Sequence, residues 1–247
     1  MKKLLLTLIC LSLIIAIVGC GSSDSGSTPG NNDGAPTPTA SLPDDDPPPP
    51  TEDPTPAVLP GFMEYRNARA GFSIQHPIAW FCLDEAIPAD DLRDLIDDVF
   101  DDNINDIFNE LGVDFNSSIV YWFDFDNAND DFVPNINVNY SDSGGLTQND
   151  LKLPELQAEF QVVFEEMLSM IIDGFSVIDD LVGKALGDNY FAVFVYSANI
   201  GGIQAGFCQA LTINGNNIYT FTLTTFVDKL PSTIAVFENM LSTLKFD

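Results

Sequence analysis

Cations are scarce in this chain of 247 residues, which has nine Lys and Arg against 37 Asp and Glu. The formal net charge is −28 at pH 7, with the single His counted as neutral. A surface of this charge repels the phosphates of nucleic acids and the headgroups of anionic lipids. The composition therefore excludes a nucleic-acid partner and also excludes docking to an anionic membrane through surface charge.

Histidine is rarer still, because His76 is the only one and it stands directly before Pro77. A typical zinc site needs several Cys or His ligands, so no such site is expected. His76 could act as the base of a nucleophile pair, or it could fill a position at a strand end that an aromatic ring would otherwise occupy. The chain has no G-x-S-x-G elbow, no Walker loop and no dinucleotide fingerprint. We therefore expect no catalytic site, no metal centre and no cofactor, and the protein is predicted not to be an enzyme.

The N-terminus carries a short basic and apolar leader. Lys2 and Lys3 precede an apolar run over residues 4–18, which is typical of a signal peptide and shorter than the roughly 20 residues of a spanning helix. The run ends Ile17-Val18-Gly19-Cys20, which resembles the bacterial lipobox. That resemblance implies cleavage after Gly19 and transfer of diacylglycerol to the Cys20 thiol. The alternatives are an uncleaved anchor and a signal peptide without lipidation.

A proline-rich segment follows the leader. Residues 21–60 contain eleven of the sixteen prolines, among Gly, Ser, Thr and Asp, and almost nothing apolar. Such a segment cannot offset its ordering entropy by burial, so we expect an extended, disordered tether; a PxxP-type ligand is the alternative. The predicted organisation is a lipoprotein signal peptide over 1–19, a lipidated cysteine with its tether over 20–60, and one globular domain over 61–247.

The domain shows alternating strand and helix patterns. Apolar and β-branched runs predict strands over 62–65, 71–75, 79–83, 119–125, 136–140, 190–196, 203–213 and 218–226. Apolar residues at helical spacing predict helices over 89–111, from Pro154 onward and from Pro231 onward. A strand meander followed by a helix predicts an α+β fold, in which helices flank an antiparallel sheet.

A family resemblance rests on the start of the domain. Tyr65, the run Gly71-Phe72-Ser73-Ile74, Pro77 and Trp80 resemble the PsbP-like family, whose type member is the extrinsic PsbP protein of photosystem II. The closing hairpin and amphipathic helix are similar too. The resemblance implies an α/β/α sandwich. This chain departs from the family at His76, where an aromatic residue is frequent, and in its acidic middle, so association with a photosystem is not implied.

The four cysteines divide into two groups. Cys10 lies in the predicted leader and Cys20 at the lipobox, which leaves Cys82 and Cys208 in the domain. An even pair of cysteines in an exported domain is a candidate disulfide, provided that the two strands are near neighbours. The alternative is two buried free thiols.

The predicted helix over 89–111 is unusually acidic on the face opposite its apolar stripe. Six pairs of acids at four-residue spacing should each cost about 0.2–0.5 kcal/mol at low salt. One interpretation is a solvated face that keeps the protein soluble, and the other is a surface for a cation or a basic partner. The acids of this candidate surface are Asp90, Asp94, Asp97, Asp98, Asp101, Asp102 and Asp106, with Asp91 and Glu110 beside them.

A second acidic cluster lies in a loop after the strand at 119–125. Its oxygen-bearing residues are Asp124, Asp126, Asn127, Asn129, Asp130 and Asp131. The cluster resembles a calcium loop in part, but Ala128 and Asn129 occupy positions where an EF-hand has a ligand and a glycine. A polar loop between two strands is the alternative interpretation.

These features together predict an extracytoplasmic lipoprotein, anchored by its N-terminal lipid to the cell membrane or the outer membrane of a bacterium. We expect a non-catalytic module that binds or scaffolds another envelope protein. The alternative function is low-affinity binding of a divalent cation, calcium in particular, by the acidic helix or the acidic loop.

Overall fold

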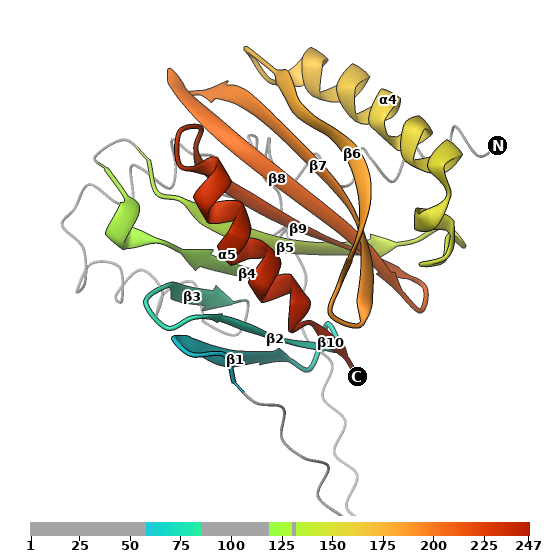
Figure 1. The fold of residues 1–247 in the computed structure, drawn as a ribbon, viewed down its shortest axis with the longest axis horizontal. Helices are drawn as coiled ribbons and strands as arrows, with labels where there is room; N and C mark the ends of the chain where they lie inside the picture. The colour runs from blue at the N-terminus through green and yellow to red at the C-terminus, as the bar shows by residue number, and fades with distance from the viewer. Residues whose placement is uncertain (1–57, 85–118, 130–131) are drawn as a thin grey trace, which may run out of the picture. The chain divides into compact units, whose positions relative to one another are not determined.

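The computed structural model describes residues 58–84, 119–129 and 132–247. Its antiparallel strands form two sheets (Figure 1). The smaller sheet has the order β1-β2-β10 and contains β1 (Phe62–Asn67), β2 (Phe72–Pro77) and β10 (Lys245–Phe246). The larger sheet has the order β3-β4-β5-β9-β8-β7-β6. Its strands are β3 (Phe81–Asp84), β4 (Val120–Phe123), β5 (Asn135–Asp142), β6 (Ser176–Leu186), β7 (Asn189–Ile200), β8 (Ile203–Asn214) and β9 (Asn217–Phe226).

Two α-helices pack on opposite faces of the larger sheet. They are α4 (Pro154–Ile171) and α5 (Leu230–Ser242), and short 3-10 turns lie at η1 (Phe125–Asn127) and η2 (Asp150–Lys152). Side chains alternate between the faces of a strand, and along β7 Val193 and Val195 join the core that contains α5, whereas Phe194 joins the core that contains α4. The predicted α+β class, with an antiparallel meander flanked by helices, is confirmed.

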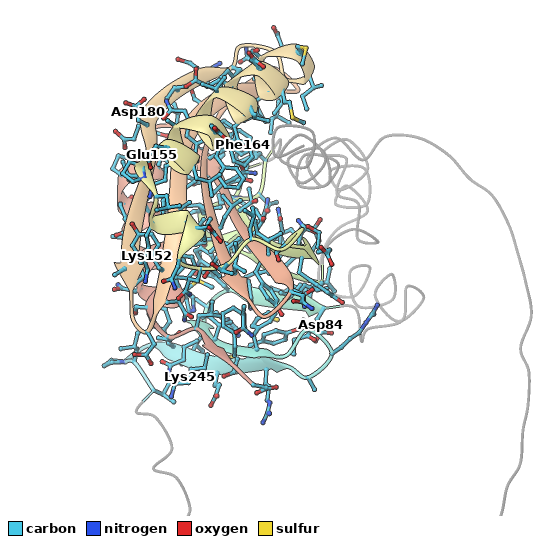
Figure 2. All side chains as sticks on the ribbon, turned by 90° about the vertical axis from the view of Figure 1, so that its right-hand side faces the viewer. Asp84, Lys152, Glu155, Phe164, Asp180 and Lys245 are labelled. Atoms are coloured by element: carbon cyan, nitrogen blue, oxygen red, sulfur yellow. The ribbon has the colours of Figure 1, made fainter. Side chains whose placement is uncertain are left out.

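The α4 helix begins where its sequence predicts, because Pro154 occupies its first turn and lacks the amide proton that a helix interior needs. Phe160, Phe164 and Leu168 of the predicted apolar stripe are almost completely buried. Phe164 stacks on Phe194 of β7 with ring centroids 6.0 Å apart. Phe164 is completely buried, whereas Glu155 is exposed; both residues are labelled in Figure 2.

The core below α5 joins the two sheets. Phe72 and Ile74 of β2 and Phe237 and Leu241 of α5 are all at most 1% exposed and belong to the same cluster as the inner face of the larger sheet. In Figure 1, α5 crosses this face and runs toward the smaller sheet. The C-terminal strand β10 then pairs with β2, so the end of the chain closes the smaller sheet.

The prediction of three long strands after α4 was incomplete, because β6 precedes them as a fourth. The strand β6 lies at the edge of the sheet, and its pairing with β7 shifts register between Val177 and Asp179 and again between Asp179 and Val182. Bulges of this kind break the alternation of period two by which a strand is recognised. The residues Asp179, Asp180 and Gly183 are also poor strand formers. The irregular edge explains why sequence patterning missed this element.

A column of neutral polar side chains lies on one face of β5 and β9. Asn135, Asn137 and Asn139 stand opposite Thr224, Thr222 and Thr220, respectively. All six are at most 8% exposed. Within the described structure, the Thr220 hydroxyl and the Asn139 side-chain carbonyl oxygen have no hydrogen-bond partner. A buried polar atom without a partner costs about 1–3 kcal/mol, so this column is a local stability deficit.

Replacing Thr220 by valine is expected to raise the free energy of unfolding by about 1 kcal/mol, because valine has the same shape and removes the unpaired hydroxyl. The urea midpoint of the purified protein measures the change. Thr222→Val is the matched control, since the Thr222 hydroxyl accepts a hydrogen bond from Gln209 Nε2 at 3.4 Å and its loss leaves that amide unpaired. Equal destabilisation by both variants would contradict the argument.

Candidate functional site

A cleft of about 360 Å³ lies between α5 and the ends of both sheets. One wall is the α5 side, with Lys229, Ser232, Thr233, Val236 and Asn239. The other wall comes from the β1 and β2 region, with Phe62, Pro77 and Trp80. The residues between the two walls are Asp124, Asn127 and Thr225. The volume is that of a pocket for a small molecule or for one large side chain of a partner.

The helical period explains how α5 serves the core and the cleft together. Leu230, Phe237 and Leu241 point into the core and are at most 2% exposed. The neighbouring stripe, offset by about one residue, faces the cleft and is mostly polar. The Ser232 and Thr233 hydroxyls donate to the Lys229 carbonyl oxygen at 2.8 and 3.0 Å. These bonds hold the first turn of α5 at the edge of the cleft.

The aromatic wall is held by two backbone hydrogen bonds. The Trp80 amide donates to the Pro77 carbonyl oxygen at 3.1 Å, and the Ile78 amide donates to the Gly61 carbonyl oxygen at 3.0 Å. These bonds tie the turn after β2 to the start of β1. Trp80 is 7% exposed, so most of the indole packs in the core and its remaining surface contributes to the cleft.

Asp124 is the charged residue set most deeply in the cleft lining, at 7% exposed. Its amide donates to the Pro134 carbonyl oxygen at 2.8 Å, which aligns the residue beside the start of β5. Asn127 donates from Nδ2 to the Asp124 carboxylate at 2.8 Å. Within the described residues, no Lys, Arg or His forms an ion pair with Asp124. The carboxylate is therefore oriented by an amide and not neutralised by a cation from the described part of the chain.

His76 lies in the core and is not a lining residue of the cleft. It is 2% exposed, and its ring lies 5.7 Å from the Trp122 ring at an interplanar angle of 35°. Its Nδ1 lies 3.0 Å from the Pro77 carbonyl oxygen. Burial lowers the pKa of His76 below its usual value, and the Pro77 carbonyl opposes that shift in part. His76 is therefore a core residue that packs beside the Trp122 ring.

The candidate disulfide between Cys82 and Cys208 is wrong, because both side chains are free thiols. The register places them in one row of the larger sheet, in the order Cys82, Trp122, Ile136, Leu223, Cys208. Four strand spacings separate the two cysteines by about 19 Å, whereas a disulfide needs Cα atoms within about 7 Å. Burial raises the pKa of each thiol to about 12. The alternative interpretation, two buried free thiols, holds for Cys208, which is completely buried, and in part for Cys82, which is half-buried.

Other predicted site residues lie partly or wholly outside the described residues. Cys20 and the acidic helix from Asp90 to Glu110 lie outside them, as do Asp130 and Asp131 of the acidic loop. In the described part of that loop, Asp124 lies beside Asn127, and Asp126 is exposed. No group of three or more His, Cys, Asp or Glu in the described ranges could hold a metal ion. Calcium binding by the acidic helix or loop stays a prediction.

The cleft as a unit has no signal in the sequence. Asp124 and Asn127 are predicted as members of a polar loop, and Phe62 and Trp80 as members of strands. Nothing local in the sequence signals that Lys229 and Asn239 of α5 face Trp80. The pairing of β4 with β5 and of β5 with β9 brings Asp124 close to the start of α5. In the described part of the chain, no helix is both long and apolar enough to cross a membrane.

Comparison with known proteins finds no matching family model and no matching curated protein. Solved structures do match. The solution structure of cyanobacterial PsbP from Synechocystis sp. PCC 6803 has 14% identity and a TM-score of 0.45, and the match covers 80% of this chain and 99% of that one. LpqN of Mycobacterium tuberculosis, described as involved in cell envelope biogenesis, has 12% identity and a TM-score of 0.45, with 74% and 90% covered.

A third match is a crystal structure from Bacteroides thetaiotaomicron VPI-5482, with 12% identity and a TM-score of 0.44; it covers 76% of this chain and 49% of that chain. A cyanobacterial PsbP protein is therefore among the matching structures, in agreement with the predicted PsbP-like fold. With identities of 12% to 14% and TM-scores of 0.45 or less, these likenesses concern the fold.

Proposed function

We propose that this protein is a lipid-anchored module of the bacterial cell envelope that binds a partner protein through the cleft beside α5 and catalyses no reaction. The cleft carries the proposal, because it combines a nearly buried aromatic residue, Trp80, with an exposed polar rim that includes Lys229, Ser232 and Asn239. Protein interfaces have this anatomy of a buried aromatic anchor inside a polar rim. The lipobox and the proline-rich tether support the envelope location.

The tether bears on how such a module would reach its partner. Lipid on Cys20 would hold the chain at a membrane, and forty residues at polyproline rise can span roughly 100 Å. The net charge of −28 opposes a direct approach to anionic lipid. A domain held away from the bilayer in this way is placed to meet another envelope protein.

Site-directed photo-cross-linking in intact cells tests the proposed cleft interface. A benzoylphenylalanine at Asn239, on the exposed rim, is expected to give a discrete adduct with one envelope protein. The control position is Glu155, which is exposed on α4 at the opposite face of the larger sheet (Figure 2). Trp80→Ala in the Asn239 background should reduce the adduct. The same adducts from both positions, or none from Asn239 in a membrane-anchored protein, would count against a cleft interface.

A further inference from the structure

Asp124 is a nearly buried residue of the cleft lining. A charge that is removed from water needs hydrogen bonds and a counter-charge, otherwise burial costs several kcal/mol. Asp124 is 7% exposed and receives the Asn127 amide at 2.8 Å. An ionised carboxylate offers about four acceptor sites on its two oxygens. The recorded bond to Asn127 leaves acceptor capacity on the carboxylate.

The described residues supply no cation to this carboxylate. The recorded ion pairs join Arg66 to Asp247 and Lys184 to Glu238, away from the cleft lining. Lys229 also lines the cleft, but it is exposed and has no ion pair among the described residues. Desolvation and loss of side-chain entropy oppose movement of the exposed Lys229 side chain onto the carboxylate. A bound group could therefore supply the positive charge that balances the Asp124 carboxylate.

The aromatic wall restricts what that bound group can be. Trp80 and Phe62 stand across the cleft from the polar stripe of α5. A guanidinium binds a carboxylate through two parallel hydrogen bonds, stacks on aromatic faces and gives up its hydration more easily than an ammonium. The strongly acidic chain also raises the local concentration of a basic partner and its rate of association. Arginine therefore fits the charge, the hydrogen-bonding capacity and the walls of the cleft.

We propose that the cleft receives an arginine side chain of the partner protein, with the guanidinium on Asp124 and the aliphatic stem against Trp80 and Phe62. This inference rests on the proposed function, since it names the group that the partner inserts. Asn127 acts as a positioning residue, because its side-chain amide donates to the carboxylate and both residues line the cleft.

Peptide binding to the full-length lipoprotein in detergent micelles tests the inference. The probe is acetyl-Gly-Arg-Gly-amide, and the neutral control is the same peptide with citrulline in place of arginine. The fluorescence of Trp80 reports binding, while Trp122, which is completely buried, contributes a constant background. The arginine peptide should bind saturably, and the citrulline peptide at least about tenfold more weakly, because it leaves the buried charge uncompensated.

Two variants of equal charge change locate the effect. Asp124→Asn should weaken binding of the arginine peptide by about tenfold or more, because it removes one partner of a buried charge pair. Asp126→Asn, at an exposed position two residues along the chain, should leave the affinity unchanged. Thermal unfolding of each variant checks that the domain is folded. If Asp124→Asn does not fold, the comparison of arginine with citrulline on the unaltered protein decides alone.

The inference is overturned if citrulline binds as well as arginine, if folded Asp124→Asn binds like the parent, or if the parent shows no saturable binding of the arginine peptide. Its failure differs from failure of the proposed function. A cross-link from Asn239 that persists in the Asp124→Asn variant would retain the cleft as an interface and remove only the arginine. If position 239 gives no cross-link when Asp124 is unaltered, the proposal of a cleft interface itself is contradicted.

Discussion

Replacing Cys20 by alanine is expected to abolish lipid labelling of this protein and to shift the protein from the membrane fraction to the soluble fraction. The thiol is the atom to which the lipobox resemblance assigns diacylglycerol, and alanine offers no nucleophile in its place. Each buried methylene of an acyl chain contributes about 0.8 kcal/mol to membrane binding, so two chains anchor a protein stably. Metabolic labelling with an alkyne fatty acid, followed by membrane fractionation, measures the change.

Cys10→Ala provides the matched control, because it makes the same substitution in the apolar run that would be removed with the signal peptide. This variant should keep both the lipid label and the membrane association. Intact-mass measurement adds a further check, since processing before Cys20 removes nineteen residues from the parent chain. Unchanged labelling and unchanged fractionation of Cys20→Ala would defeat the assignment of a lipoprotein.

Trp122→Ala is expected to lower the free energy of unfolding by about 3–5 kcal/mol, the range for truncating a large buried aromatic residue. Trp122 lies on β4 and is completely buried. It meets the Tyr65 ring edge-on at 5.5 Å and the His76 ring at 5.7 Å. Since Tyr65 and His76 belong to the smaller sheet and Trp122 to the larger one, the cavity would open where the two sheets are packed together.

Urea unfolding followed by circular dichroism measures this loss against that of an exposed apolar residue. Met170→Ala serves as the reference, because Met170 is 75% exposed on α4 and should change stability by no more than about 0.5 kcal/mol. Since the free energy of unfolding of an ordinary domain is about 5–15 kcal/mol, Trp122→Ala would remove a large part of it. Equal midpoints for the two variants would show that Trp122 does not join the sheets as described.

The regular elements were predictable because their signals are local. The run from Ile203 to Asn214 forms a strand whose Phe207 joins one core and whose neighbour Cys208 joins the other. The α5 helix starts one residue before Pro231. The edge strand β6 was missed because its bulges and its acidic residues hide the alternation. The disulfide was wrong for a related reason: two cysteines on strands give no information about how many strands lie between them.

The candidate site was predictable only in part. Asp124 and Asn127 attracted attention as oxygen-bearing residues, yet their spacing suggested a cation loop and gave no hint of a shared cleft with Trp80. Lys229 and Asn239 carried no signal at all, since polar residues on a surface helix are ordinary. A site assembled from four separate stretches of chain has no local pattern that could identify it.

The sequence alone determined the acidic charge and the α+β class, because composition and periodicity act over a few neighbouring residues. It also predicts the leader, the lipobox and the proline-rich tether, and these stay predictions. The tertiary structure decided the features that depend on strand order and helix packing. It placed Cys82 and Cys208 four strand spacings apart, brought α5 over the joint between the two sheets, and set the nearly buried Asp124 in the same cleft as Trp80 and Phe62. These outcomes depend on which distant segments pair, and burial of apolar surface across the whole domain selects that pairing.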